Sequence, residues 1–184
     1  MPTPLRSLTM KTFTPVALAC VALITGCATT GRMAPSRLAT ATITTSAGMP
    51  AGTAQISAAG DRLTIDVAVS GLQPGAHGLH LHAVGMCDAP GFTTAGPHLN
   101  PAGHMHGMMN PAGHHLGDLP NIVVGPDGTA TLSAQIDGTR EAMLASLFDA
   151  DGTAIVIHAG QDDYKTDPSG NSGPRIACGV FSRP

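Results

Sequence analysis

Six histidines and one aspartate are spaced along this chain as the donors of two neighbouring metal sites would be. Imidazole nitrogen binds copper and zinc well, and a carboxylate completes a tetrahedral zinc site. Residues two apart on a strand point to the same face of a sheet, so the first two histidines can hold one ion together. The spacing therefore predicts two adjacent metal sites. The donors are His80, His82, His98, His106, His115, Asp118 and His158.

The composition favours short strands over large helices. The chain has no Trp, one Tyr and four Phe, so its core must rely on aliphatic side chains, which suit thin β-layers. Its 23 Gly and 15 Pro make up about a fifth of the 184 residues and indicate many turns. Leu63, Ile65, Val67 and Val69 alternate with polar or small residues, as in a half-buried strand.

Turn signals divide the rest of the chain into short segments. We expect a break at 71–75 and a hairpin in which Gly125-Pro126-Asp127-Gly128 joins strands at 122–124 and 130–134. Residues 154–158 form another expected strand, and residues 140–148 are expected to be a loop with weak helical content. Strands 8–15 residues apart, separated by turns, predict a β-sandwich or barrel.

Length and charge limit the function classes. A chain of 184 residues suits one ordinary domain. Its formal net charge is −3, without the basic footprint of a nucleic-acid-binding protein. Removing residues 1–26 takes away Arg6 and Lys11 and no acidic residue, which leaves 7 basic against 12 acidic residues and a charge of −5.

The N-terminus has the pattern of an export signal. The apolar stretch Val16–Ile24 is too short to span a bilayer and has the length of a signal-peptide core. It ends in Ile24-Thr25-Gly26-Cys27, which resembles the lipobox of bacterial lipoproteins, in which the cysteine is lipidated; plain signal cleavage is the alternative. Met10 is an alternative start to Met1. We expect a signal peptide at 1–26, a flexible tether at 27–39 and one domain at 40–184.

Two cysteines remain in the domain. Behind an export signal, Cys87 and Cys178 indicate one structural disulfide in an oxidising compartment, although two buried thiols remain open from composition alone. Closing a loop of about 90 residues would stabilise the fold by about 4–5 kcal/mol in the chain-entropy model.

Five sequence blocks, in order and spacing, resemble the copper–zinc superoxide dismutases in their bacterial periplasmic form. The resemblance implies an all-β fold, an eight-stranded Greek-key barrel whose metals are held by two long loops at 87–121 and 159–175. Long loops without strand pattern are usually functional or disordered. The blocks are the HxH pair at 80–82, GPHxNP at 96–101, HxxGDLxN at 114–121, VxH at 156–158 and Arg175-Ile176-Ala177-Cys178-Gly179-Val180.

The resemblance also divides the donors between one copper and one zinc per subunit. His98 would be shared as a bridging imidazolate. His104 and His114 lie beside expected zinc ligands, but the family interval favours His106 and His115. The implied copper set is His80, His82, His98 and His158; the implied zinc set is His98, His106, His115 and Asp118.

Further roles follow from the same resemblance. Asp162 matches a carboxylate that joins a copper histidine to a zinc histidine, with Asp163 a weaker candidate and a solvated loop acid the alternative. Arg175 matches the arginine that guides the anionic substrate to copper, and Lys165 is the one further cation of its loop. His77 matches a residue that braces the barrel. In the family, the two cysteines of the domain are bridged.

The implied activity is superoxide dismutation, an oxidoreductase reaction in which copper cycles and zinc is structural. Superoxide would be the substrate, outside the cytoplasm in the periplasm, with membrane contact only through a lipid on Cys27. A homodimer is compatible with the resemblance, and the sequence leaves the oligomeric state open. One rival is a copper-storage protein, supported by residues 104–109, in which two His and three Met accompany Gly107; these Met are also explained as loop filler. The other rival, a family member without turnover, conflicts with the complete copper set.

Overall fold

The computed structural model describes Met1 and residues 34–184, and the latter fall within one compact unit. The predicted signal peptide beyond Met1, the lipobox cysteine and most of the predicted tether lie outside the described residues. No helix among the described residues combines the length and apolar character needed to cross a bilayer. The strands are β1 (Ser36–Thr45), β2 (Pro50–Ala59), β3 (Arg62–Val69), β4 (Gly75–His77), β5 (Leu79–His82), β6 (Ile122–Val124), β7 (Ala130–Ile136), β8 (Ala154–His158) and β9 (Arg175–Val180).

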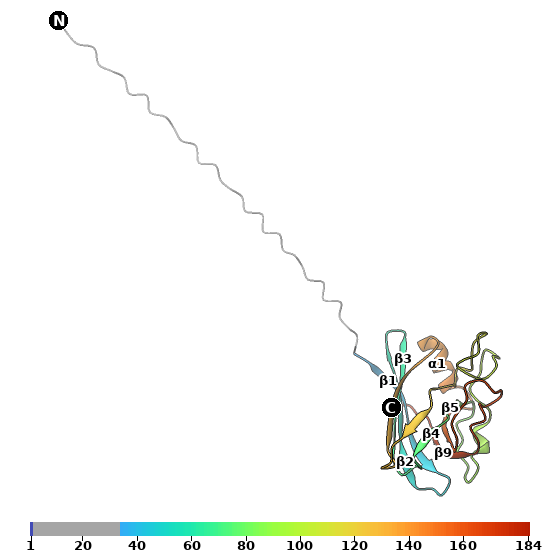
Figure 1. The fold of residues 1–184 in the computed structure, drawn as a ribbon. Helices are drawn as coiled ribbons and strands as arrows, with labels where there is room; N and C mark the ends of the chain where they lie inside the picture. Colours follow the sequence, from blue (N-terminus) through green and yellow to red (C-terminus); the bar gives the residue numbers. More distant parts are fainter. Residues whose placement is uncertain (2–33) are drawn as a thin grey trace. The chain divides into compact units, whose positions relative to one another are not determined.

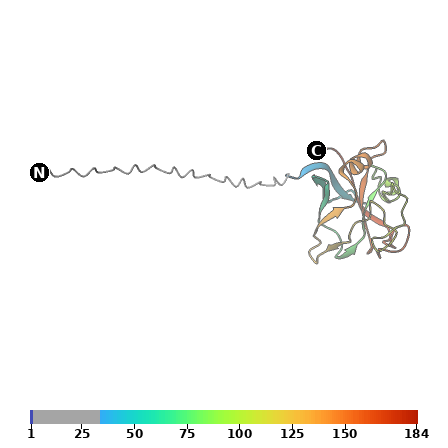
Figure 2. The same cartoon turned by 90° about the horizontal axis from the view of Figure 1, so that it is seen from above.

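The strands form a curled antiparallel sheet. Seven pair in the order β5-β8-β9-β1-β2-β3-β7, and β4 pairs with β6 in a small second sheet. Only Gly78 separates β4 from β5, so these two strands form one interrupted strand. Counted in this way, the described strands are the eight of the predicted barrel. Seen from above, the strands curve around a common interior (Figure 2).

The core lies inside this curved sheet. In β3 the side chains of Leu63, Ile65, Val67 and Val69 are all buried and alternate with exposed or half-buried residues, which confirms the predicted period-two strand. The matching residues of β2 face the same interior, and Ile56 pairs with Ile65 in the ladder. Burying such side chains stabilises a fold by about 1.5–3 kcal/mol each.

The first strand begins earlier than expected. β1 starts at Ser36, which pairs with Ala58 of β2, although residues 36–39 were expected to belong to the tether. Leu38 and Ala39 are buried in the core, and their burial holds this end of the strand in the sheet.

The predicted hairpin at 125–128 forms as a turn but not as a paired hairpin. Gly125 N–H donates to Thr129 O (2.9 Å), and Gly128 N–H donates to Gly125 O (2.9 Å). Beyond the turn the strands take other partners: β6 pairs with β4, and β7 pairs with β3. The turn therefore connects the small sheet to the large one, of which Figure 1 labels β1, β2 and β3 side by side.

The expectation of a loop at 140–148 was wrong, because an α-helix, α1 (Arg140–Leu147), occupies it. Thr139 caps this helix, and its side-chain oxygen accepts a hydrogen bond from Ala142 N–H at 3.2 Å. Met143 and Leu147, four residues apart on one face, are buried against the core. The cap and this apolar pair stabilise a helix too short to form alone.

Two long connections cover the β5–β8 side of the sheet, one between β5 and β6 and one between β8 and β9. Each matches a predicted metal loop, and the first contains a short 3₁₀ helix, η1 (Thr93–Ala95). A disulfide joins Cys87 of the first connection to Cys178 of β9, as predicted. Buried Phe92 and Ala95 pack in a small second cluster with Cys178, so the disulfide and this cluster together fix the first loop to the sheet.

Candidate metal centre

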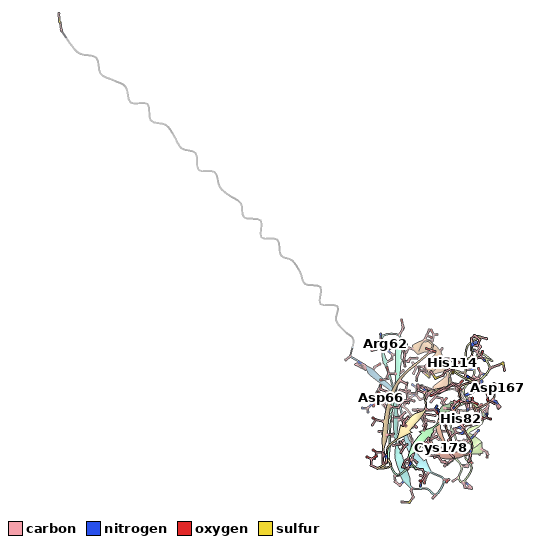
Figure 3. The ribbon with its side chains drawn as sticks, viewed as in Figure 1. Arg62, Asp66, His82, His114, Asp167 and Cys178 are labelled. Atoms are coloured by element: carbon pink, nitrogen blue, oxygen red, sulfur yellow. A yellow bond between two sulfur atoms is a disulfide. The ribbon has the colours of Figure 1, made fainter. Side chains whose placement is uncertain are left out.

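The predicted ligands come together on the face of β5 that the two long loops cover. His80 and His82 point away from the barrel core, whereas Leu79 and Leu81 point into it, and all four side chains are fully buried. His158 ends the neighbouring strand β8. Figure 3 shows His82 among the loops, away from Arg62 and Asp66 on β3.

Backbone pairing to Leu81 brings the loop ligands to the same place. Leu81 N–H donates to Gly117 O at 2.8 Å, and Leu81 O accepts from Leu99 N–H at 2.8 Å. These contacts set His98 opposite His82 and Asp118 opposite His80. A Cβ on Gly117 would overlap Leu81 O, so this close approach requires glycine.

A first group contains the four predicted copper ligands. One donor atom from each lies within 4.8 Å of the others. A buried nitrogen without a hydrogen-bond partner is unusual in a folded protein, and four of them beside one another suit the ligands of a metal ion. In this group the unpartnered buried atoms are His80 Nδ1, His82 Nε2, His98 Nε2 and His158 Nε2, and among the described residues the same holds for one atom of the second group, His106 Nδ1.

A second group surrounds Asp118. Its Oδ1 lies 3.0 Å from His98 Nδ1, 3.0 Å from His106 Nδ1 and 3.3 Å from His115 Nδ1. The Nδ1 atoms of His98 and His115 are 3.4 Å apart. Donors about 2.0–2.1 Å from a tetrahedral zinc ion lie roughly 3.3 Å from one another. The three nitrogens and one oxygen therefore fit zinc.

His80 is also near the second group, since one of its nitrogens lies within 4.8 Å of donors on His98, His106 and Asp118. We favour His115 as the fourth member, because His80 Nε2 is already hydrogen-bonded to Asp162 and His80 Nδ1 belongs to the first group. His98 presents one nitrogen to each group: Nδ1 faces Asp118, and the unpartnered Nε2 is the donor left for the first group.

The other ring nitrogens are held by the protein. Asp162, which is fully buried, accepts hydrogen bonds from His80 Nε2 at 2.7 Å and from His106 Nε2 at 3.0 Å. His82 Nδ1 donates to Gly96 O, and His158 Nδ1 donates to Gly173 O, both at 2.9 Å. Such partners fix the tautomer and orientation of metal-binding imidazoles.

Burial favours the neutral form of three rings in the first group. Loss of water is the largest cause that lowers the pKa of His80 to about 3, of His82 to about 2 and of His158 to about 4. Neutral imidazole is the form that binds a metal, so these rings are ready to do so at neutral pH.

Two members of the second group, Asp118 and His106, favour their charged forms, whereas burial lowers the pKa of His115. Burial alone would raise the pKa of Asp118 and of Asp162, but hydrogen bonds from His106 and other donors lower both. Burial disfavours the charged form of His106, yet the same two carboxylates outweigh it and raise its pKa to about 9. A cation at this position, whether a proton or a metal ion, is therefore favoured.

The neighbouring candidates lie outside both groups. His104 is exposed, and its Nδ1 donates to His114 O at 3.0 Å. His114 Nε2 lies 3.2 Å from the exposed Asp137 carboxylate. Asp163 is exposed and accepts from the side chain and backbone of Thr166. Both ring nitrogens of His77 lie near backbone carbonyl groups, with Nδ1 2.8 Å from His158 O and Nε2 2.8 Å from Gln73 O.

Arg175 lies beside the first group. Its Nη1 donates to Phe92 O at 2.6 Å and its Nη2 donates to Gly96 O at 2.7 Å, so the guanidinium shares one carbonyl with His82. Burial lowers its pKa, and its charge contributes to the lowered pKa of His82. Lys165, the other cation of this loop, is exposed.

Asn121 is a positioning residue that motif reasoning did not single out. Its side-chain amide donates to Asp162 O at 2.9 Å and accepts from Asp162 N–H at 2.8 Å. Its own N–H donates to Tyr164 Oη at 2.7 Å. A Cβ on Gly170 would overlap the Asp162 carboxylate. The only sequence signal was that Asn121 closes the HxxGDLxN block.

Comparison with known proteins agrees with this geometry. The sequence profile of the family described as copper/zinc superoxide dismutase (SODC) matches residues 50–181. Superoxide dismutase [Cu-Zn] of Caulobacter vibrioides is 40% identical over 151 residues, 78% of this chain and 84% of that protein. Superoxide dismutase [Cu-Zn] 1 of Aquifex aeolicus is 42% identical over 132 residues, 70% of this chain and 78% of that protein.

Two solved structures extend the comparison. A SOD-like protein from Bacillus subtilis superposes with a TM-score of 0.72 at 36% identity, covering 79% of this chain and 99% of the other. Cu/Zn superoxide dismutase from Brucella abortus superposes with a TM-score of 0.63 at 26% identity, covering 81% and 100%. With the profile spanning most of the chain and relatives above 30% identity, this protein belongs to the copper/zinc superoxide dismutase family.

Proposed function

We propose that the protein dismutates superoxide, so that two superoxide ions and two protons give dioxygen and hydrogen peroxide. The observation that supports this most directly is His98, whose two ring nitrogens face two different groups of donors. One imidazole shared between two sites positions a redox metal beside a structural one. The family uses copper and zinc, and the two donor groups fit them.

The ligand assignment follows from which atoms are free. For copper we propose His80 Nδ1, His82 Nε2, His98 Nε2 and His158 Nε2, which are buried and unpartnered. For zinc we propose Asp118 Oδ1 with Nδ1 of His98, His106 and His115, which lie at tetrahedral separations. Each subunit would hold one ion of each metal.

When bound, copper supplies the one-electron oxidation and reduction, and zinc supplies a fixed positive charge beside His98. His98 Nε2 is the atom that can take up a proton and release it to the reduced oxygen species, while Nδ1 keeps the ring in place. Arg175, fixed by two carbonyl groups, supplies the positive charge that attracts the anion. Burial of the surrounding rings excludes water from their donor atoms.

Metal analysis combined with superoxide consumption tests this function. Protein loaded with both metals should consume superoxide with a second-order rate constant orders of magnitude above that of the same protein holding zinc alone. His104→Gln, which leaves both donor groups intact, serves as the matched control and should retain metals and rate. Equal rates for the loaded and the copper-free protein would exclude the proposed activity.

We further propose that the enzyme is exported to the periplasm and held at a membrane by lipid on Cys27. Disulfides form and persist outside the reducing cytoplasm, which fits the Cys87–Cys178 bond. Lipid chains bind a membrane with about 0.8 kcal/mol per buried CH₂. Mass spectrometry of the mature N-terminus should find lipid on Cys27, and Cys27→Ser should release the protein. An unmodified Cys27 would rule out the anchor.

The same preparation allows the oligomeric state to be measured. We propose a homodimer, in keeping with the family resemblance, and light scattering of the Cys27→Ser protein should give twice the chain mass. A single-chain mass at micromolar concentration would exclude it.

A further inference from the structure

A cluster of methionines lies exposed in the first metal loop. Met105 is 60% exposed, Met108 is 43% exposed and Met109 is 62% exposed, all within five positions. Large apolar side chains normally contribute to a core, and here they do not, since the structure packs none of the three against either hydrophobic cluster. We call residues 104–109 the methionine segment.

The backbone of the methionine segment is held in a defined shape. Asn110 N–H donates to Gly107 O at 2.9 Å, which places Met108 and Met109 at the two corners of a tight turn. Met109 N–H donates to Tyr164 O at 3.2 Å, and a Cβ on Gly107 would overlap that same carbonyl. The turn is therefore fixed against the second loop, and its two flexible thioether side chains extend from adjacent positions.

His104, at the start of the segment, is held with one nitrogen free. The Asn100 amide clamps its backbone, donating to His104 O at 2.8 Å and accepting from His104 N–H at 3.0 Å. The ring rests on Gly113, where a Cβ would come within 2.9 Å of it. Because Nδ1 donates to His114 O, the neutral ring carries its lone pair on Nε2, which makes no hydrogen bond within residues 34–184.

Thioether sulfur and imidazole nitrogen are soft and borderline ligands, and together they select Cu(I) over calcium, magnesium or Cu(II). We propose that His104, Met105, Met108 and Met109 form an exposed accessory site for Cu(I), separate from the two buried donor groups. The segment lies on the loop side of the molecule, where Figure 3 labels His114, whose carbonyl orients His104, and Asp167, which accepts from His106 N–H. This site goes beyond the dismutase activity and does not depend on it.

Titration of the loaded enzyme with Cu(I) tests the site. Protein already holding copper and zinc is kept under ascorbate without oxygen and given Cu(I) in competition with a coloured Cu(I) chelator. The wild type should retain one further equivalent. The triple variant Met105→Leu, Met108→Leu and Met109→Leu should lose it, and His104→Gln should weaken it at least tenfold. Leucine conserves volume at these exposed positions, so the fold should be kept.

Two exposed methionines elsewhere provide the matched control. Met49 precedes β2 and Met86 precedes the disulfide, and both are exposed to a similar extent as the three segment methionines. The double variant Met49→Leu and Met86→Leu should bind the further equivalent as the wild type does. Retention of no further Cu(I) by the wild type, or equal retention by the triple variant, would overturn the proposal.

Methyl NMR with Ag(I), a redox-silent probe of soft sites, gives a second readout that does not depend on chelator competition. In loaded protein with labelled methionine methyl groups, the signals of Met105, Met108 and Met109 should shift together at one equivalent, while those of Met49 and Met86 stay in place. Shifts of equal size at all five would show non-specific binding to thioethers and would also overturn the site.

Discussion

His80 and His106 donate hydrogen bonds to opposite oxygens of one buried carboxylate, Asp162, at 2.7 and 3.0 Å. His80 belongs to the first donor group and His106 to the second, so one side chain positions a ring in each proposed metal site. Asn121 and Tyr164 N–H in turn hold Asp162. This arrangement predicts that the two sites depend on one another through Asp162.

Asp162→Asn should weaken the binding of both metals. The amide offers one acceptor oxygen where the carboxylate offers two. One of the two histidines therefore loses its acceptor, and the other keeps a neutral acceptor in place of a charged one. Loss of such a partner costs about 10–100-fold in metal affinity. Chelator competition, run separately for copper and zinc, measures both. Asp163→Asn, at the adjacent exposed carboxylate, is the control, and a loss confined to one metal would contradict the shared role.

Substituting a residue that belongs to only one donor group should affect one metal and leave the other bound. His158 contributes only to the first group, so His158→Ala should lose copper and all dismutase activity while keeping one zinc. Asp118→Ala should lose zinc and thermal stability, yet keep part of the activity once copper is restored. Metal content and superoxide consumption measured on the same samples decide the matter. Activity in copper-free His158→Ala protein would refute the assignment.

Stability of the metal-free protein should have an optimum near neutral pH. Burial lowers the pKa of His80, His82 and His158 to about 3, 2 and 4, so between pH 4 and 6.5 the unfolded chain binds more protons and stability falls as pH falls. His106 behaves oppositely, because its raised pKa of about 9 contributes stability below pH 6.5 that is lost as pH rises toward 9.

Urea unfolding of metal-free protein at pH 5, 7 and 9 measures this optimum, with the highest midpoint expected at pH 7. His106→Gln should remove the decline between pH 7 and 9 and keep the decline toward pH 5. A midpoint that climbs steadily from pH 5 to 9 in the wild type would show that His106 does not hold its proton in the fold.

Much of this architecture is accessible from sequence because it depends on local pattern. The alternation in β3 is a direct consequence of one buried sheet face, and the continuous apolar run that ends at His158 reflects a strand buried on both faces. The choice of His106 and His115 over their neighbours came from the interval of the family that the sequence resembles. In the structure His106 belongs to a donor cluster and His115 Nδ1 lies 3.3 Å from Asp118 Oδ1, whereas His104 and His114 make other contacts.

What sequence could not supply depends on contacts between distant segments. β6 pairs with β4 and not with β7 across the turn, because the closure of the sheet determines this pairing and the turn residues do not. α1 depends on burial of Met143 and Leu147 in a core built by other strands. Likewise, the carbonyl groups of Gly96 and Gly173 orient two ligands through backbone alone, which no side-chain motif records.

Removing the disulfide should destabilise the protein and lower its rate of superoxide consumption. Cys87 and Cys178 are 91 residues apart, and opening such a loop costs about 4–5 kcal/mol in the chain-entropy model. Cys178 packs with Phe92, whose carbonyl holds Arg175, so the guanidinium should also lose part of its support. The double variant Cys87→Ser and Cys178→Ser should show a lower urea midpoint and a lower rate with both metals bound. An unchanged rate would separate the disulfide from the positioning of Arg175.

Arg175 should raise the rate by attracting the anion. Its guanidinium is fixed by Phe92 O and Gly96 O, and the second carbonyl also holds His82 of the proposed copper set. After removal of residues 1–26 the formal charge is −5, because 7 basic residues stand against 12 acidic ones, so superoxide meets net repulsion everywhere but at a local positive field. Such focused fields raise association rates by about 10–10³ and weaken as salt screens them.

Arg175→Ala should therefore lower the second-order rate roughly tenfold or more with copper and zinc still bound, within the range expected for steering. Arg175→Glu should lower it further, and its residual rate should rise with ionic strength, since screening then relieves repulsion. Lys165→Ala removes an exposed cation of the same loop and should change the rate in the same direction by less. Pulse radiolysis at several salt concentrations, with metal content measured in parallel, provides the rates. If Arg175→Glu matches the wild type at low salt with full copper occupancy, Arg175 has no part in guiding the substrate.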